Sequence, residues 1–385
     1  MHDATKCVKA PEVSEDGYAS LTVPTHRAST IVFESAADYA TRSQRDLDGY
    51  SYGLHGTPTS RVLEAQLTAL EGGKHTVLLP SGQSAIAVAM LSVLRPGDTV
   101  LIPDSVYPPV TGFCRDFLAP LGIGHDIYRP DASDLEAKIT GSVRLIWAES
   151  PGSTTMEVQD IPAIAALAKA RGILTGIDNT WATPLYLKPL ALGVDLSMQA
   201  LTKYPGGHSD LLMGSVTVAD SDLRKGLRDT MRMLGLGVSP DAVALVLRGL
   251  QTMSVRLAHS GRIALGLAER IAARGEGLEV LHPARPGSVG HDLWKRDFAG
   301  ASGVFSVVLP EAAEPKLEAA LNGLRVFALG ASWGGTRSLI APMSVAGARV
   351  NDHPRNARTI LRLSIGLEDP ADLTADVDTL FDALR

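Results

Sequence analysis

Residues 76–90, TVLLPSGQSAIAVAM, decide the fold of this chain because they pass directly from a buried strand into a helix. The opening TVLLP is short, apolar and bounded by turn residues, which is typical of a buried strand. Ser81 and Gly82 follow at once, and the apolar side chains of Ile86 and Met90 then fall on one helical face. We therefore predict a strand–turn–helix unit of the kind from which α/β sheets are built.

The same alternation continues along the chain. Four further apolar runs bounded by turn residues are predicted strands, namely 99–103, 143–148, 173–178 and 196–201. A helix between them begins after Asp160, has Pro162 in its first turn and stops at Gly172, the expected order of Pro near a helix start and Gly past its end. This alternation predicts an α/β fold with a mainly parallel sheet, whose ligands bind at the carboxyl ends of the strands.

The pattern changes beyond about residue 250. A long helical pattern covers 251–273, a loop with Pro and Gly covers 282–290, and GVFSVVLP and LRLSIGL follow as strands separated by helices. The first fifty residues are polar and weakly periodic, as in an arm that lies on another surface. We predict an arm at 1–56, a large domain at 57–249 and a smaller α+β domain at 250–385.

The composition argues against several function classes. The 385 residues carry a net charge of −6, which gives no electrostatic basis for binding nucleic acid. Cys7 and Cys114 form no Cys-x-x-Cys pair, and the histidines form no metal-ligand pattern. Because no apolar run is long enough for export or for a bilayer, we expect a cytoplasmic protein that binds neither membrane nor metal.

Ser81, Gly82 and Gln83 form a candidate anion site. A Ser-Gly turn that opens a helix after a strand presents free backbone N–H groups at the positive end of the helix dipole, which suits a phosphate. A helix start without a ligand has the same pattern. Neither G-x-G-x-x-G after a strand nor G-x-x-x-x-G-K-[ST] occurs, so the sequence does not favour a nucleotide-binding dehydrogenase or a triphosphate site.

Two charged residues stand at later strand ends. Asp178 closes the strand 173–178, and Lys203 follows the strand 196–201. Taken singly, such an acid also suits a helix cap, and such a lysine is usually solvated. Together with a phosphate site, an acid for a ring nitrogen and a lysine for an aldehyde are the fixed points that pyridoxal phosphate requires. Desolvation beside a cationic ring would lower the lysine pKa toward neutral pH.

Short motifs occur in one order from about residue 17 to the end of the chain. They are ESPGS at 149–153 with TMEV at 155–158, IDNTWA at 177–182, TKY at 202–204 with GHSD at 207–210, GH at 290–291 with WKRDF at 294–298, SWGG at 332–335 and RLSIGLED at 362–369. In these motifs the chain resembles the Cys/Met-metabolism family of pyridoxal-phosphate enzymes, closest to its bacterial cystathionine β-lyases. The resemblance implies the PLP-dependent transferase fold of type I, like that of aspartate aminotransferase, with pyridoxal 5'-phosphate in the large domain.

The resemblance implies a role for each candidate residue. Lys203 would hold the cofactor as a Schiff base and remove the substrate Cα proton, and Asp178 would pair with the pyridine nitrogen. Tyr107 would stack on the cofactor ring and exchange a proton with the substrate amine, although a surface tyrosine in its Tyr-Pro-Pro turn stays an alternative. The phosphate would be bound by Ser81, Gly82, Gln83, Thr202 and, from a neighbouring subunit, Tyr52.

The substrate contacts are implied in the same way. Arg362 would bind the α-carboxylate with two parallel hydrogen bonds, unless it forms a surface ion pair. Ser332 and Trp333 would line the same pocket, and Tyr52 would reach it from the neighbour. The chain departs from the family at Leu54, where an arginine is expected to reach the phosphate, and at Ala331, which replaces a larger residue.

The reaction implied is the cleavage of L-cystathionine to homocysteine, pyruvate and ammonia, a transsulfuration step of methionine biosynthesis. The residues leave open a cystathionine γ-lyase or γ-synthase, a cysteine desulfhydrase, a cysteine-S-conjugate lyase and a non-catalytic regulatory protein that binds the cofactor. The implied partners are a small amino-acid thioether and further copies of the chain. Tyr52 requires at least a dimer, and the family pattern suggests a homotetramer of two dimers.

Overall fold

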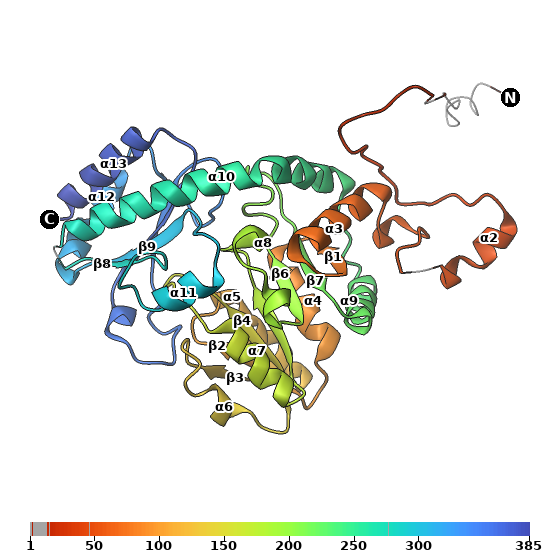
Figure 1. The fold of residues 1–385 in the computed structure, drawn as a ribbon, viewed down its shortest axis with the longest axis horizontal. Helices are drawn as coiled ribbons and strands as arrows, with labels where there is room; N and C mark the ends of the chain where they lie inside the picture. The colour runs from red at the N-terminus through yellow and green to blue at the C-terminus, as the bar shows by residue number, and fades with distance from the viewer. Residues whose placement is uncertain (1, 3–13, 15, 46, 276) are drawn as a thin grey trace.

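The computed structural model describes residues 2, 14, 16–45, 47–275 and 277–385. The segment that carries the short helix α2 (Ala36–Ala40) extends away from the body of the molecule (Figure 1). From α3 (Pro58–Glu71) onward, the described chain forms two sheets with helices around them. Cys7 lies outside the described residues.

Within the described part of the chain, seven strands form one sheet in the order β1-β7-β6-β5-β4-β2-β3. The neighbours from β6 through β3 run parallel, and β7 runs antiparallel to both β1 and β6. The mainly parallel sheet and its five predicted strands are confirmed, whereas β3 and β7 were not predicted. The strands are β1 (His75–Leu79), β2 (Thr99–Pro103), β3 (Gly124–Tyr128), β4 (Val143–Glu149), β5 (Leu174–Asp178), β6 (Leu196–Gln199) and β7 (Gly214–Val218).

Helices cover both faces of this sheet, because its strands bury alternate residues on opposite sides. In β1, Val77 and Leu79 join an apolar core with residues of α4 (Gly82–Val93) and α9 (Ser221–Met233). Leu78 packs with residues of α3 and of α10 (Pro240–Ala273) on the other face. The predicted helix with the Asp160 cap is confirmed as α7. The helices of this part are α3 (Pro58–Glu71), α4 (Gly82–Val93), α5 (Pro108–Phe113), α6 (Leu135–Lys138), α7 (Ile161–Ala170), α8 (Thr183–Tyr186) and α9 (Ser221–Met233).

A second sheet, in the order β10-β11-β12-β9-β8, forms the smaller part of the molecule. Its apolar face packs on α10 and α13, with Phe305 and Phe381 in the shared core. The helix α10 begins at Pro240, about eleven residues before the predicted start, and spans both parts of the molecule (Figure 1). The elements are α10 (Pro240–Ala273), β8 (Glu279–Leu281), α11 (His291–Asp297), β9 (Val304–Val308), α12 (Leu317–Asn322), β10 (Ala328–Leu329), β11 (Leu339–Met343), β12 (Ile360–Ser364) and α13 (Pro370–Ala383).

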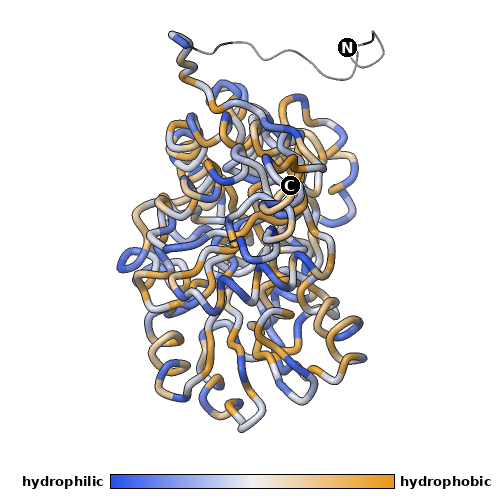
Figure 2. Tube along the Cα trace, turned by 90° about the vertical axis from the view of Figure 1, so that its right-hand side faces the viewer, coloured by the Kyte–Doolittle hydropathy of each residue, from blue (hydrophilic) through white to orange (hydrophobic). Residues whose placement is uncertain are grey.

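Apolar residues are distributed over the whole fold. Figure 2 shows short apolar and polar segments alternating along the trace. Among the described residues, no helix is both long enough and apolar enough to cross a membrane.

Candidate active site

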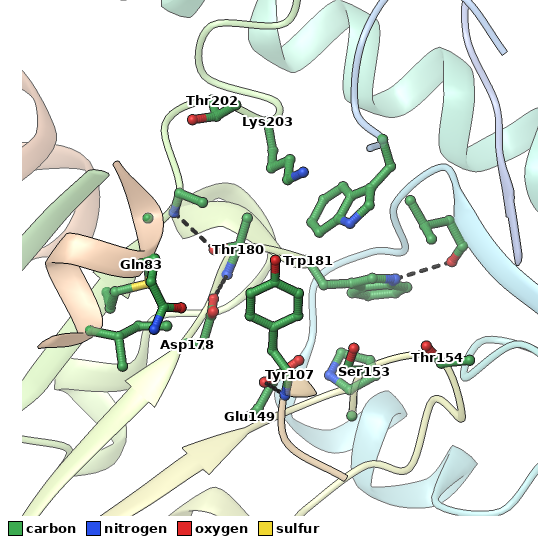
Figure 3. A pocket seen from close by; sticks show the side chains of 18 of the residues that line it. Gln83, Tyr107, Glu149, Ser153, Thr154, Asp178, Thr180, Trp181, Thr202 and Lys203 are labelled. Atoms are coloured by element: carbon green, nitrogen blue, oxygen red, sulfur yellow. Dashed lines mark hydrogen bonds between the residues drawn. The ribbon is translucent and has the colours of Figure 1, made fainter. Parts of the chain in front are cut away.

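A cavity of about 280 Å³ lies at the carboxyl ends of β4, β5 and β6. This is the sheet edge where parallel strands place the residues that follow them, so segments distant in sequence meet there. Figure 3 shows the labelled side chains gathered from several elements around this cavity. Of the predicted site residues, those that line it are Ser81, Gly82, Gln83, Tyr107, Asp178, Thr202, Lys203, Trp333 and Arg362.

Two predicted residues stand apart from this lining. Ser332 contacts the site through Lys203, whose Nζ donates to the Ser332 Oγ at 2.8 Å. Tyr52 is absent from the described lining of the cavity, and 52 % of its surface is exposed on the segment that precedes α3. Its contact with a neighbouring subunit therefore stays a prediction.

Lys203 presents an amine that loses its proton near neutral pH. Burial and the nearby Arg362 guanidinium lower the pKa of Lys203 to about 8, although Asp178 acts in the opposite direction. Its Nζ lies 5.1 Å from the centre of the Trp333 ring. Close backbone packing holds this segment in place, since a Cβ on Gly334 would come within 3.1 Å of the Tyr204 nitrogen. The Lys203 amine is thus held in position, and its lowered pKa allows it to lose its proton at a pH near 8.

The first turn of α4 forms one end of the cavity. Ser81 caps the helix, its hydroxyl accepting from the Ser84 N–H at 3.0 Å, while the Ser81 carbonyl accepts from Ala85. The backbone N–H groups of Gly82 and Gln83 have no partner within the helix, as is general for a first turn. A Cβ on Gly82 would lie only 2.8 Å from that of Ala200, so the close approach to the end of β6 requires glycine.

Thr202 lies in the cavity, but its hydroxyl is engaged with Met213. It donates to the Met213 carbonyl at 3.2 Å and accepts from the Met213 N–H at 3.1 Å. A phosphate contact through this hydroxyl would require its hydrogen to turn away from Met213. The contact of Thr202 with a phosphate therefore stays a prediction.

Asp178 and Glu149 place two carboxyl groups side by side at the sheet edge. Their strands pair in register, with Glu149 opposite Asp178. The Thr180 N–H donates to Asp178 at 2.9 Å, and the Tyr107 N–H donates to Glu149 at 2.7 Å. Removal from water raises both pKa values, that of Glu149 well above its usual range because Asp178 adds repulsion. A cationic group beside Asp178 would relieve this repulsion.

Tyr107 stands over these carboxyl groups and keeps its hydroxyl proton. Its side chain is 45 % exposed, and its hydroxyl points into the cavity in Figure 3. Partial burial and the carboxylates of Glu149 and Asp178 raise the pKa of Tyr107. The residue can therefore donate a hydrogen bond to a group in the cavity.

Arg362 extends from β12 of the second sheet into the cavity. One terminal nitrogen donates to the carbonyl of Ala331 at 2.6 Å, which orients the guanidinium. The side chain is nearly fully buried and lies in the same cavity as Lys203. A buried guanidinium with unused N–H groups suits a carboxylate. The surface ion pair considered from the sequence is excluded by this burial.

Leu54, the departure from the family pattern, packs inside its own chain. A Cβ on Gly237 would come within 2.9 Å of the Leu54 side chain, so the leucine contacts the turn before α10. The Nδ1 atom of the neighbouring His55 forms a hydrogen bond with the Ser51 hydroxyl at 2.8 Å. Burial, together with Arg232, Arg228 and Arg61, lowers the pKa of His55. Three arginines therefore supply positive charge close to the position where the expected one is missing.

The loop after β4 forms another wall of the cavity, and its importance was not predicted. Thr154 and Met156 line the cavity with φ values of 67° and 60°, which few residues other than glycine adopt. Arg349 holds the loop by donating to the Ser153 carbonyl at 2.8 Å and to the Thr155 hydroxyl at 2.9 Å. Glu149 was also missed, although its place at a strand end is the same signal that identified Asp178.

The chemistry of these donors fits pyridoxal phosphate. The free N–H groups of α4 suit a phosphate, the enclosed Asp178 carboxyl suits a pyridinium, and the Lys203 amine suits an aldehyde. All three groups face one cavity, so one ring could meet them together.

Comparisons with known proteins agree with this arrangement. The family model for Cys/Met metabolism PLP-dependent enzymes matches residues 4–382. A putative cystathionine β-lyase of Rhizobium johnstonii is 42 % identical, covering 96 % of this chain and 93 % of that protein. The cystathionine β-lyase of Escherichia coli is 38 % identical, covering 92 % of each.

Two further matches have other activities. An L-alanine/L-glutamate racemase of Wolbachia pipientis is 35 % identical, covering 98 % of this chain and 96 % of that protein. A crystal structure of cystathionine γ-synthase from Xanthomonas oryzae, in complex with cystathionine, has a TM-score of 0.86 at 30 % identity, covering 96 % of this chain and 95 % of that one. The fold is thus shared by enzymes of several reaction types.

Proposed function

The chain belongs to the family of Cys/Met metabolism PLP-dependent enzymes, and from this premise we propose that it is a carbon–sulfur β-lyase that cleaves L-cystathionine to homocysteine, pyruvate and ammonia. The observation that carries the proposal is the Lys203 amine, with a pKa of about 8, in one cavity with Asp178, Tyr107 and Arg362. The β-lyase names of relatives up to 42 % identical support β-elimination over the other reactions of the family.

Pyridoxal phosphate, when bound, would supply an electron sink for the bond that breaks at the substrate Cα. The first turn of α4 would bind its phosphate, with Ser81 as the cap and the N–H groups of Gly82 and Gln83 as donors. Asp178 would bind the pyridine nitrogen, and Thr202 and the partner subunit's Tyr52 would add phosphate contacts. The assignments of the lining residues are supported by the donor types that they bring to the cavity, and that of Tyr52 by the resemblance to the family.

The substrate would be oriented by its carboxylate. Arg362 would bind both carboxylate oxygens, with Ser332 and Trp333 closing the pocket beside it. Lys203 would then remove the proton from the substrate Cα, assisted by Ser332, which accepts a hydrogen bond from the amine. Tyr107 would exchange a proton with the substrate amine. Loss of the Cβ–sulfur bond releases homocysteine, and one water completes the conversion of the remaining fragment to pyruvate and ammonia.

The product of L-cystathionine tests this reaction. The purified holoenzyme should form homocysteine and pyruvate in equal amounts, measured by thiol chromatography and by lactate dehydrogenase coupling. Cysteine with 2-oxobutyrate would instead identify a γ-lyase and refute the proposal. Lys203→Ala should lower pyruvate formation by about 10²- to 10⁴-fold, the usual contribution of a positioned base.

Racemisation is a second candidate, favoured by the match to the Wolbachia racemase. Lys203 and Tyr107 both reach the cavity and would provide two proton-transfer groups for one Cα. Incubation of the holoenzyme with L-alanine, followed by chiral chromatography, separates the two activities. Formation of D-alanine faster than cystathionine cleavage would make racemisation the main reaction.

A further inference from the structure

The start of α5 carries Tyr107 into the active-site cavity. Pro108 and Pro109 fill the first two helical positions and have no N–H group, and the Val110 N–H donates to the Tyr107 carbonyl at 2.8 Å. The Tyr107 N–H is therefore the donor that this helix start offers to a partner outside the helix. That partner is Glu149, whose Oε2 accepts at 2.7 Å.

Glu149 stands on a part of the fold that is itself held in place. It ends β4, a strand that pairs with β2 on one side and with β5 on the other. The Glu149 N–H donates to the side-chain oxygen of Gln159 at 3.0 Å, and Gln159 is fully buried. An acceptor on this strand end has a defined position, and the hydrogen bond passes that position on to Tyr107. None of the roles proposed above uses Glu149.

The turn before Tyr107 is packed against the loop after β4. The Ser153 N–H donates to the Ser105 carbonyl at 2.8 Å, and a Cβ on Gly152 would lie 2.5 Å from that of Ser105. These contacts fix the chain two residues before Tyr107. The bond to Glu149 extends the anchoring to the backbone of Tyr107, whose half-exposed side chain is restrained less by packing than a buried one.

The Tyr107 N–H requires an acceptor oxygen on Glu149 and does not require its charge. Burial and the neighbouring Asp178 raise the pKa of Glu149 well above its usual range, which favours the neutral acid. A neutral carboxyl group still accepts through its carbonyl oxygen. Glutamine has the same shape and an oxygen of the same kind, so it should replace Glu149 in this contact.

We propose that Glu149 is a positioning residue that acts through Tyr107, because its side-chain oxygen holds the Tyr107 backbone and thereby sets where the Tyr107 ring and hydroxyl lie in the cavity. The consequence for catalysis rests on the proposed function, in which Tyr107 exchanges a proton with the substrate amine. The anchoring itself does not rest on that function, since it can be measured without turnover.

Hydrogen exchange of the holoenzyme, followed by mass spectrometry, measures the anchor directly. Glu149→Leu keeps the bulk of the side chain but removes the acceptor, so the peptide that contains the Tyr107 N–H should exchange about tenfold faster. Glu149→Gln should exchange at the wild-type rate. Glu318→Leu, at an exposed glutamate of α12 outside the cavity lining, is the matched control and should also exchange as the wild type does. Glu149→Ala is the second acceptor-free variant, for use if leucine prevents folding.

A double-mutant cycle with Tyr107→Phe tests whether Glu149 acts through the Tyr107 hydroxyl. Glu149→Leu should lower kcat for L-cystathionine about 10- to 100-fold with a smaller change in KM, because a misplaced group loses proton transfer more than binding. In the Tyr107→Phe background the same substitution should lower kcat less than about threefold, since no hydroxyl is left to misplace. Glu149→Gln should keep the wild-type kcat and its pH dependence.

Three results would overturn the proposal. They are Glu149→Gln impaired as severely as Glu149→Leu, an unchanged exchange rate at Tyr107 in Glu149→Leu, and losses in kcat that simply add in the double variant. A holoenzyme that does not cleave L-cystathionine would refute the proposed function alone, because the exchange measurements need no turnover.

Discussion

The Lys203 amine is the group whose protonation decides when the cofactor can be captured. Its pKa of about 8, against 10.5 for an ordinary lysine, comes mainly from burial and then from Arg362. The lowered value means that the neutral amine becomes the major form above pH 8. An exposed lysine would reach this state more than two pH units later.

We expect the apoenzyme to incorporate pyridoxal phosphate faster as the pH rises from 7 to 9. The neutral fraction of Lys203 increases about tenfold over this interval for a pKa near 8. Stopped-flow absorbance would measure the rate, with a free lysine derivative as the control whose rate keeps rising through pH 10. A protein rate that follows the same course as the free derivative would contradict the low pKa.

Arg362 should determine substrate affinity more than turnover. Arg362→Lys keeps the positive charge but loses the paired donors, so KM for L-cystathionine should rise about 10- to 100-fold with a smaller fall in kcat. Arg337→Lys, an exposed arginine outside the cavity lining, should leave both constants unchanged. An equal loss in kcat with KM unaltered would contradict the assignment.

Helix α4 connects local capping with cofactor binding. The Ser81 side chain orders the first turn, and Gly82 and Gln83 of that turn line the cavity. Loss of such a cap costs about 1 kcal/mol of helix stability. If this turn became disordered, the N–H groups of Gly82 and Gln83 would no longer be held together for the phosphate.

Ser81→Ala should therefore lower the free energy of unfolding by about 1 kcal/mol and weaken cofactor binding as well. Ser239→Ala removes the corresponding cap of α10, where the side chain accepts from Asp241, and is the matched control. It should lower stability to a comparable degree while cofactor affinity stays the same. Denaturant unfolding and fluorescence titration of the apoenzyme measure the two quantities. If both variants bound the cofactor with equal affinity, the assignment of the phosphate to the first turn of α4 would be wrong.

At the scale of the whole molecule, residues 16–45 form a segment in which the described chain buries no residue fully. It extends from the body in Figure 1, and Tyr18, Leu21 and Val32 are exposed on it. Apolar side chains exposed in this way are typical of an interaction surface. We propose that this segment contacts a second copy of the chain and brings Tyr52 to that copy's active site, in a tetramer of two dimers.

Mixing two inactive variants tests this arrangement. In a hybrid dimer of Lys203→Ala and Tyr52→Ala chains, one site would combine an intact Lys203 with an intact Tyr52 from the other chain. Random pairing of equal amounts should restore about one quarter of the wild-type activity after joint refolding. No recovery, despite hybrid dimers detected by native mass spectrometry, would mean that Tyr52 does not serve the neighbouring site.

The sequence alone determined the strand and helix alternation, the sheet edge of the candidate site and nine of the residues that line its cavity, because these depend on local periodicity and on motifs. It did not predict two strands of the large sheet, because β3 is a largely polar edge strand and β7 is rich in Gly, Ser and Thr although it is buried. In the small sheet it did not predict β8, β10 and β11. Only the tertiary structure decided the pKa of Lys203 and the pairing of Glu149 with Asp178. Each of these depends on burial and on groups distant in sequence, which no local pattern records.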